Sequence, residues 1–178
     1  MKVTVGVSGG IAAYKAAELV RALQQQALDV HVVMTAAAQQ FITPLTFASL
    51  TGHRVITGLW DGDGQVQNAN SDIEHISEAQ STEALVIAPA TANILARLAH
   101  GMADDFLTTM ALATPAPLIL APAMNVQMWE HPATQANLAT LAQRGARIIA
   151  PESGYLACGM VGDGRLANTD TNVATILD

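Results

Sequence analysis

Hydrophobic residues along the chain follow two alternating patterns. In the first, short runs carry hydrophobic residues at nearly every position and are rich in β-branched types. Runs of this kind are typical of strands that are buried on both faces of a sheet. Five runs therefore predict strands: Val3–Val7, Val30–Thr35, Ala84–Ala88, Leu118–Ala121 and Arg147–Ala150.

The second pattern has the spacing of an amphipathic helix. In Ile11–Ala27, Leu19 and Leu23 share one face, while Arg21 lies outside it. Four later segments also predict helices, the last of them with Asn168 or Thr169 as its N-cap. These segments are Thr91–His100, Asp104–Ala113, Pro132–Arg144 and Thr169–Asp178.

The alternation of strands and helices predicts the fold class. A chain of 178 residues suffices for one domain with a full core, so residues 1–178 are expected to form a single α/β domain. Its sheet should be parallel and doubly wound, with helices on both faces. Two polar, glycine-containing regions, Asp61–Ser71 and Pro151–Asn168, are predicted to be loops. Ligands bind such sheets beyond the carboxyl ends of the strands, so a binding site is expected in the segments that follow the strands.

The amino-acid composition of the chain limits the kinds of partner that it is expected to bind. Only 13% of the residues are charged and 51% are hydrophobic, against a usual charged share of about 25%. We therefore expect a homo-oligomer that hides hydrophobic surface; the alternative is an alanine-rich monomer with a bland surface. The net charge of −7 and the scattering of eight Lys and Arg residues argue against nucleic acid or a membrane as a partner.

The same sequence favours a cytoplasmic location. No hydrophobic run is long enough to span a bilayer, and no signal peptide precedes the first predicted strand. The single cysteine, Cys158, excludes an intrachain disulfide. Histidine and cysteine do not pair at the spacing of metal ligands, so no metal site is predicted. His31 falls inside a predicted strand and is expected to be structural.

The segment after the first strand predicts an anion site. Ser8, Gly9 and Gly10 form a glycine turn where a helix begins, and the N–H groups of such a turn can bind a phosphate. The spacing differs from the dinucleotide fingerprint G-x-G-x-x-G. The second strand also ends in Thr35 rather than in an acidic residue, which favours a phosphate monoester such as FMN over NAD. A tight turn without a ligand is the alternative.

Two later post-strand segments carry further candidates. Ala92 and the neighbouring small residues would let a flat ring lie close to the backbone, and Thr91 and Asn93 could hydrogen-bond its polar edge. A helix cap at Thr91 or Asn93 is expected in any case. After the fourth strand, the neutral amide of Asn125 suits a carboxylate that must leave as CO₂, because a cation would stabilise the ground state. A turn-forming role for Asn125 is the alternative.

Two residues could handle protons. Cys158 lies in a glycine-rich segment, where a thiol can donate a proton to a carbanion-like intermediate. A lone cysteine is more often an inert buried residue, but the glycine-rich surroundings favour a functional thiol. His75 lies at the end of the predicted loop beside two acidic residues and could titrate near neutral pH.

Three motifs in order resemble the flavin-containing cysteine decarboxylase family. They are Pro-Ala-Thr-Ala-Asn-Ile at 89–94, Pro-Ala-Met-Asn at 122–125 and Ala-Cys-Gly at 157–159. The first departs from the family's common form, with Thr91 for Ser and Ile94 for Thr, but it keeps the hydroxyl. The resemblance covers nearly the whole chain and implies a Rossmann-like, flavodoxin-type flavoprotein with FMN as its cofactor.

The resemblance also implies a reaction. Family members remove the cysteine carboxylate of a substrate such as 4′-phosphopantothenoylcysteine, giving 4′-phosphopantetheine for coenzyme A synthesis. The cysteine side chain is transiently oxidised to a thioaldehyde, CO₂ leaves and the electrons return.

Each role in that scheme falls on residues of this chain. His75 would assist the oxidation, Asn125 would hold the carboxylate and Cys158 would protonate the reduced intermediate, while residues 151–168 would form a clamp over the substrate. The cofactor would lie against Ser8, Gly9, Gly10, Thr35, Thr91, Ala92 and Asn93, and the substrate against Ala123, Met124, Asn125, Ala157 and Cys158.

The family further implies partners and alternatives. Its members form trimers or dodecamers with FMN between subunits, so that His75 could serve a neighbouring site, and bacterial members are often fused to phosphopantothenate–cysteine ligase. The alternatives are a peptidyl-cysteine decarboxylase and a non-catalytic flavin-binding regulatory subunit. A flavin prenyltransferase is disfavoured by the intact second and third motifs, and an NAD-binding domain is the weakest rival.

Overall fold

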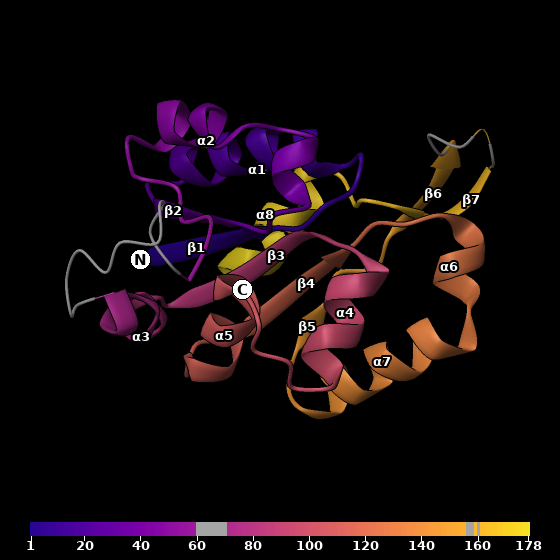
Figure 1. The fold of residues 1–178 in the computed structure, drawn as a ribbon. Coiled ribbons are helices and arrows are strands. Elements are labelled where there is room, and N and C mark those ends of the chain that lie inside the picture. The colour runs from indigo at the N-terminus through magenta and orange to yellow at the C-terminus, as the bar shows by residue number, and fades with distance from the viewer. Residues whose placement is uncertain (60–70, 156–158, 160) are drawn as a thin grey trace.

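A parallel sheet forms the centre of the molecule (Figure 1). The computed structural model describes residues 1–59, 71–155, 159 and 161–178, without the side chains of 71–75. In this part of the chain the central sheet has five strands in the order β2-β1-β3-β4-β5. The strands are β1 (Lys2–Val7), β2 (Asp29–Met34), β3 (Ala84–Ala90), β4 (Leu118–Pro122) and β5 (Arg147–Ile148). This sheet confirms the predicted fold class, and its order reverses between β1 and β3.

Helices cover both faces of the sheet (Figure 1). One face carries α1 (Ala13–Gln25), α2 (Pro44–Thr51) and α8 (Thr169–Leu177). The other carries α3 (Ser71–Ser81), α4 (Ala92–Ala99), α5 (Phe106–Ala113) and α7 (Pro132–Gln143). A 3₁₀ turn, η1 (Ala38–Gln40), follows β2, and α6 (Val126–Glu130) follows β4. None of the described helices is long and apolar enough to cross a membrane.

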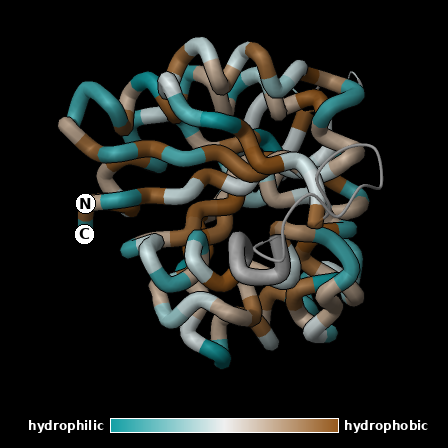
Figure 2. Tube along the Cα trace, turned by 60° about the vertical axis from the view of Figure 1, so that its left-hand side comes forward, coloured by the Kyte–Doolittle hydropathy of each residue, from teal (hydrophilic) through white to brown (hydrophobic). Residues whose placement is uncertain are grey.

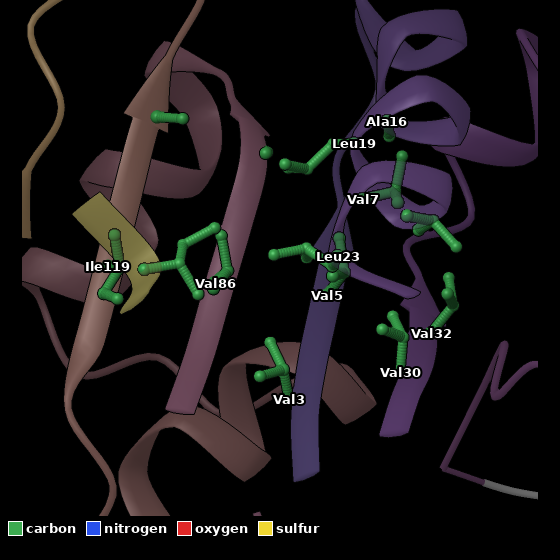
Figure 3. Close-up of a cluster of buried hydrophobic side chains, with 14 of the residues drawn as sticks. Val3, Val5, Val7, Ala16, Leu19, Leu23, Val30, Val32, Val86 and Ile119 are labelled. Carbon is green, nitrogen blue, oxygen red and sulfur yellow. The ribbon is translucent and has the colours of Figure 1, made fainter. Parts of the chain in front are cut away.

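Alternation along the strands divides the core between the two faces. In β3, Val86 packs toward α1, whereas Leu85 and Ile87 pack toward α4 and α5. Figure 3 shows Val3 and Val5 of β1 on the same side as Val86, in the cluster that Leu19 and Leu23 of α1 complete. Hydrophobic segments accordingly run through the middle of the molecule in Figure 2, with hydrophilic ones toward its periphery.

Three predictions about elements need correction. The last predicted strand, Arg147–Ala150, is only Arg147–Ile148 long. The segment 151–168, predicted to be a loop, contains a hairpin of β6 (Glu152–Tyr155) and β7 (Val161–Arg165). Neither strand alternates hydrophobic with polar residues, so the usual sequence signal is absent.

The third correction concerns His75. It belongs to the backbone of α3, which begins at Ser71, rather than to the end of a loop. Neither α3 nor α2 was predicted. The predicted loop at 61–71 lies, apart from Ser71, outside the described residues.

Candidate active site

A cavity of about 740 Å³ lies at the carboxyl ends of β1, β2, β3 and β4. Its volume falls within the range of about 300–1,000 Å³ that is usual for cofactor and small-molecule sites. The cavity is lined by Ser8, Gly9, Gly10, Thr35, Thr91, Ala92 and Asn93, which are the residues predicted to contact a cofactor, and by Ala123, Met124 and Asn125 from the predicted substrate motif. Four post-strand segments that are distant in sequence therefore meet in one place.

The Ser8 hydroxyl joins the first and third of these segments. Ser8 is buried, and its Oγ donates a hydrogen bond of 2.6 Å to the carbonyl of Pro89. The same oxygen accepts a bond of 3.1 Å from the backbone N–H of Thr91. Because β1 and β3 are neighbours where the strand order reverses, this bridge fixes the spacing of the two loops that line the cavity.

Gly9 allows a close approach between the loops after β1 and β2. A Cβ atom at Gly9 would lie 2.4 Å from the Cβ of Ala37, which is far inside van der Waals contact. At Gly10, by contrast, the nearest atom would be the Cγ2 of Thr91 at 3.4 Å. The first glycine of the pair is therefore required by packing, and the second is not.

The start of α1 has the character predicted for an anion site. Its N-cap, Ala12, has no side chain that can accept a hydrogen bond from the first turn, and no acidic residue lies in that turn. The first N–H of the helix, at Ala13, bonds to the carbonyl of Gly10 at 2.9 Å. The positive end of the helix dipole thus meets the cavity without a carboxylate from its own first turn.

Thr35 and Thr91 each bind the backbone of the segment that follows them. Thr35 Oγ1 accepts from the N–H of Ala38 at 3.2 Å. Thr91 is the N-cap of α4, where its Oγ1 accepts from the N–H of Ile94 at 3.3 Å. The prediction that Thr91 caps a helix is therefore confirmed. The residue also lines the cavity.

Asn125 is half-buried and caps a short helix. Its Oδ1 accepts a hydrogen bond of 2.8 Å from the N–H of Gln127 in α6. Asn125 also lines the cavity. Its role in the turn is therefore compatible with a position in the candidate site. The oxygen end of the amide is engaged by the helix, which sets the orientation of the side chain.

The hairpin β6–β7 docks against this substrate motif. The N–H of Met124 bonds to the carbonyl of Gly164 at 2.9 Å. Gly164 has φ +129, and a Cβ atom there would lie 2.3 Å from the carbonyl oxygen of Met124. A Cβ at Gly162 would lie 2.9 Å from Val126 Cγ2. Glycines in β7 thus permit the region predicted as a clamp to lie directly against the Pro-Ala-Met-Asn segment.

The cavity wall also holds a charged group that was not predicted from the sequence. Arg97 of α4 and Asp105, the N-cap of α5, both line the cavity. The Arg97 guanidinium bonds to Asp105 at 2.8 Å and also to Asp104. The hydrogen bond to Asp104 is the main reason why the pKa of Arg97 is raised. Arg97 lies within a helix rather than directly after a strand, so its place beside the strand ends has no signal in the post-strand segments.

Three predicted residues are not placed. Ala157 and Cys158 lie outside the described residues, as does the side chain of His75. Their proposed roles remain predictions from the sequence.

The comparisons with known proteins agree with this architecture. The coenzyme A biosynthesis bifunctional protein CoaBC of Vibrio vulnificus is 48% identical over 165 residues, which are 93% of this chain but only 40% of that protein. A solved structure of a Cys-to-Ser mutant of PPC decarboxylase, complexed with pantothenoylaminoethenethiol, has a TM-score of 0.85 and 29% identity, covering 99% of this chain and 96% of its own. The FMN-dependent cysteine decarboxylase SpaF has a TM-score of 0.82 and 33% identity over 99% and 95% of the two chains.

The chain thus spans less than half of the curated relative that it matches. A family model described as Flavoprotein matches all of residues 1–178. By fold, by motif and by this match, the chain belongs to the Flavoprotein family.

Proposed function

We propose that this chain binds FMN in the cavity and decarboxylates 4′-phosphopantothenoylcysteine to 4′-phosphopantetheine, a step of coenzyme A synthesis. The observation that carries the proposal is the convergence of four post-strand segments, including both described motifs of the cysteine decarboxylases, on one cavity of about 740 Å³. The names of the relatives, a coenzyme A biosynthesis protein and two decarboxylases, support the same reaction.

The residues that line the cavity fit FMN. The start of α1 offers backbone N–H groups to a phosphate, while the paired Arg97 leaves little positive charge for that purpose. Gly10, Ala92 and the hydroxyls of Thr35 and Thr91 suit the ribityl chain and a flat ring close to the backbone. When bound, FMN supplies reversible two-electron oxidation and reduction, which the protein side chains lack.

Asn125 would orient the substrate by its carboxylate. Its amide is fixed by the bond to Gln127 and carries no charge. A neutral donor holds the carboxylate in place without the strong ground-state stabilisation that a guanidinium would give, so the barrier to losing CO₂ stays lower. The docked hairpin would then exclude water from the reacting end of the substrate.

Cys158 and His75 complete the proposal from the motifs. Cys158 would donate a proton to the carbanion-like intermediate, and His75 would assist proton movement during oxidation. A Cys158→Ser variant should keep bound FMN but lose formation of 4′-phosphopantetheine. Normal product formation by this variant would remove Cys158 from the mechanism.

A second candidate is decarboxylation of a peptide that ends in cysteine. It is favoured by the 33% identity to a cysteine decarboxylase whose name gives no pantothenoyl substrate. A competition assay separates the two: the FMN-loaded protein receives equal concentrations of 4′-phosphopantothenoylcysteine and a cysteine-terminated peptide. The proposal expects the first compound to be consumed and the peptide to remain. Preferential loss of CO₂ from the peptide would replace the proposed substrate with the second candidate.

Oligomeric assembly belongs to the same proposal. Ile11, Tyr14, Phe41 and Leu45 are large hydrophobic residues that the single chain exposes in and beside α1 and α2, and Leu45 is 73% exposed. A homotrimer, alone or as part of a dodecamer, would cover such residues. Light scattering on the FMN-loaded protein should give a mass of three or twelve chains, and a monomer would contradict this part of the proposal. A fused ligase domain and a cytoplasmic location stay predictions from the sequence.

A further inference from the structure

Three potential metal ligands meet at the amino-terminal edge of the sheet, opposite to the cavity. Asp29 and His31 are two positions apart in β2, so their side chains lie on the same face of the strand. His53 follows α2 and brings its Nε2 to 2.7 Å from Asp29 Oδ1. The Nε2 of His31 lies 3.3 Å from the other carboxylate oxygen. One ligand atom from each residue lies within 4.8 Å of the other two.

The backbone holds these residues in place. Ile56 forms a parallel bridge with Val33 of β2, and its N–H bonds to the carbonyl of Val32 at 3.0 Å. The N–H of His53 itself bonds to Thr51 Oγ1 at 3.1 Å. His53 is therefore fixed between the end of α2 and a segment that is hydrogen-bonded to the strand carrying the other two ligands.

The two imidazole rings bring their Nε2 atoms to one carboxylate. They stack with centroids 4.2 Å apart and an angle of 21° between their planes. In this arrangement both Nε2 atoms contact the same Asp29 carboxylate. Because the planes are nearly parallel, the two Nε2 lone pairs do not yet point at one position. Rotation of the half-exposed His53 ring would let a single ion reach two nitrogens and one oxygen, a ligand set that suits Zn²⁺.

A second carboxylate supports His31 from behind. Glu78 of α3 places its Oε1 3.5 Å from His31 Nδ1, the ring nitrogen that does not face Asp29. Glu78 is mostly buried and is itself fixed by Lys2 Nζ at 2.8 Å and Thr4 Oγ1 at 3.1 Å. Histidines that bind metals usually donate their other N–H to a carboxylate of this kind, which sets the tautomer. This contact uses the ring nitrogen of His31 that would not bind the ion, and it points to the same use.

We propose that Asp29, His31 and His53 bind Zn²⁺ or a chemically similar divalent transition-metal ion, with water completing the coordination. The bound ion links β2 to the segment after α2 and stabilises that edge of the sheet. The proposal does not depend on FMN or on decarboxylation. Sequence spacing did not predict it, because 24 positions separate Asp29 from His53.

Calorimetric titration of the FMN-loaded, chelator-treated protein with Zn²⁺ tests the site. Zn²⁺ is a suitable probe because it has no redox chemistry that would disturb a flavin. We expect one ion per chain, and binding at least about tenfold weaker in His53→Gln and in Asp29→Asn. Glu78→Gln should weaken binding by about 10–100-fold, the usual effect of losing a carboxylate behind a metal-bound histidine. The matched control is His100→Gln, which changes an exposed histidine at the end of α4 and should bind Zn²⁺ like the parent.

Three results would overturn the proposal. They are the absence of Zn²⁺ binding, binding that persists in both His53→Gln and Asp29→Asn, and binding that is lost in Cys158→Ser, which removes the only thiol. Melting curves without Zn²⁺ verify that each variant folds. Where one does not, anomalous diffraction from Zn²⁺-soaked crystals of the parent decides: an ion among the three side chains supports the site, and no ion there overturns it.

Discussion

The Ser8 hydroxyl is the smallest feature on which the geometry of the cavity depends. It bonds to the carbonyl of Pro89 and to the N–H of Thr91, two backbone groups at the end of β3. Ser8 is 2% exposed and its bond to Pro89 is buried, so removing the hydroxyl leaves that buried carbonyl without its side-chain partner. Ser8 therefore lines the cavity and also stabilises the two loops that form its wall.

Ser8→Ala should lower the free energy of unfolding by about 1–3 kcal/mol, because a buried acceptor and a part-buried donor lose their partner. Urea unfolding measures this change. Ser49→Ala, at an exposed position in α2, is the control and should change stability by less than about 0.5 kcal/mol. Equal effects of the two substitutions would show that the bridge contributes nothing.

Gly9→Ala should weaken FMN binding by at least about tenfold, which corresponds to about 1.4 kcal/mol. The new methyl group would meet Ala37 at 2.4 Å and push apart the loops after β1 and β2. Gly154→Ala in β6, which does not line the cavity, is the control, since its nearest contact would be an ordinary 3.4 Å. Fluorescence titration with FMN measures both affinities, and an unchanged affinity in Gly9→Ala would argue against a cofactor in this turn.

At the scale of elements, the position of the hairpin β6–β7 is expected to affect substrate turnover most. It contacts Met124 beside the Asn125 cap, and glycines in β7 allow the approach. The hairpin is not part of the central sheet. Substitutions in it should therefore affect turnover more than they affect the core.

Gly164→Ala should reduce turnover of 4′-phosphopantothenoylcysteine by at least about tenfold while FMN affinity changes little. The added Cβ would clash with the Met124 carbonyl at 2.3 Å, and φ +129 is strained for alanine. Gly154→Ala in β6 is the control, because its new contact with Arg165 would be 3.4 Å. Steady-state rates and flavin titrations measure the two effects, and equal rates for both variants would contradict a clamp role.

The base of the hairpin is joined to α8 by a pH-sensitive contact. Glu152 Oε1 accepts from the N–H of Asn168, the N-cap of α8, at 2.9 Å. This bond is the main cause that lowers the pKa of Glu152 from its usual value of 4.5. Because the folded pKa is the lower one, the contact stabilises the protein above the unfolded pKa and is lost as the pH falls through the folded pKa.

An NMR titration should thus find the Glu152 carboxyl ionised at a lower pH than a free glutamate. Below about pH 4.5 the protein loses the stability that the ionised Glu152 contributes through its contact with Asn168. The Glu152→Gln variant should lack this part of the acid-dependent loss. Asp170, exposed in the first turn of α8, provides the control as Asp170→Asn. An ordinary pKa for Glu152 would show that the contact does not form in solution.

At the scale of the whole molecule, the sequence pattern predicted the central sheet well. Strands buried on both faces carry a continuous hydrophobic signal, as Val3–Val7 and Ala84–Ala88 show, and glycine or polar residues limit the helices between them. The post-strand segments could then be placed together, because parallel strands bring their carboxyl ends to the same edge.

The parts that the sequence did not predict depend on tertiary contacts. The hairpin has no alternating pattern, and its strands pair across glycines that fit against Met124 and Val126. Arg97 enters the cavity wall from within a helix and is paired there with Asp105. The Asp29–His53 contact joins residues 24 positions apart through a bridge beside β2 that no local pattern signals.

The central claim is that the chain binds FMN in the cavity and decarboxylates 4′-phosphopantothenoylcysteine there. Its most direct test is anaerobic mixing of the purified, FMN-reconstituted protein with this compound, with the visible flavin spectrum and the release of CO₂ followed together. We expect bound flavin, equal amounts of CO₂ and 4′-phosphopantetheine, and oxidised flavin when the substrate is exhausted. Failure to bind FMN, or bound FMN without release of CO₂ from this compound, would contradict the account.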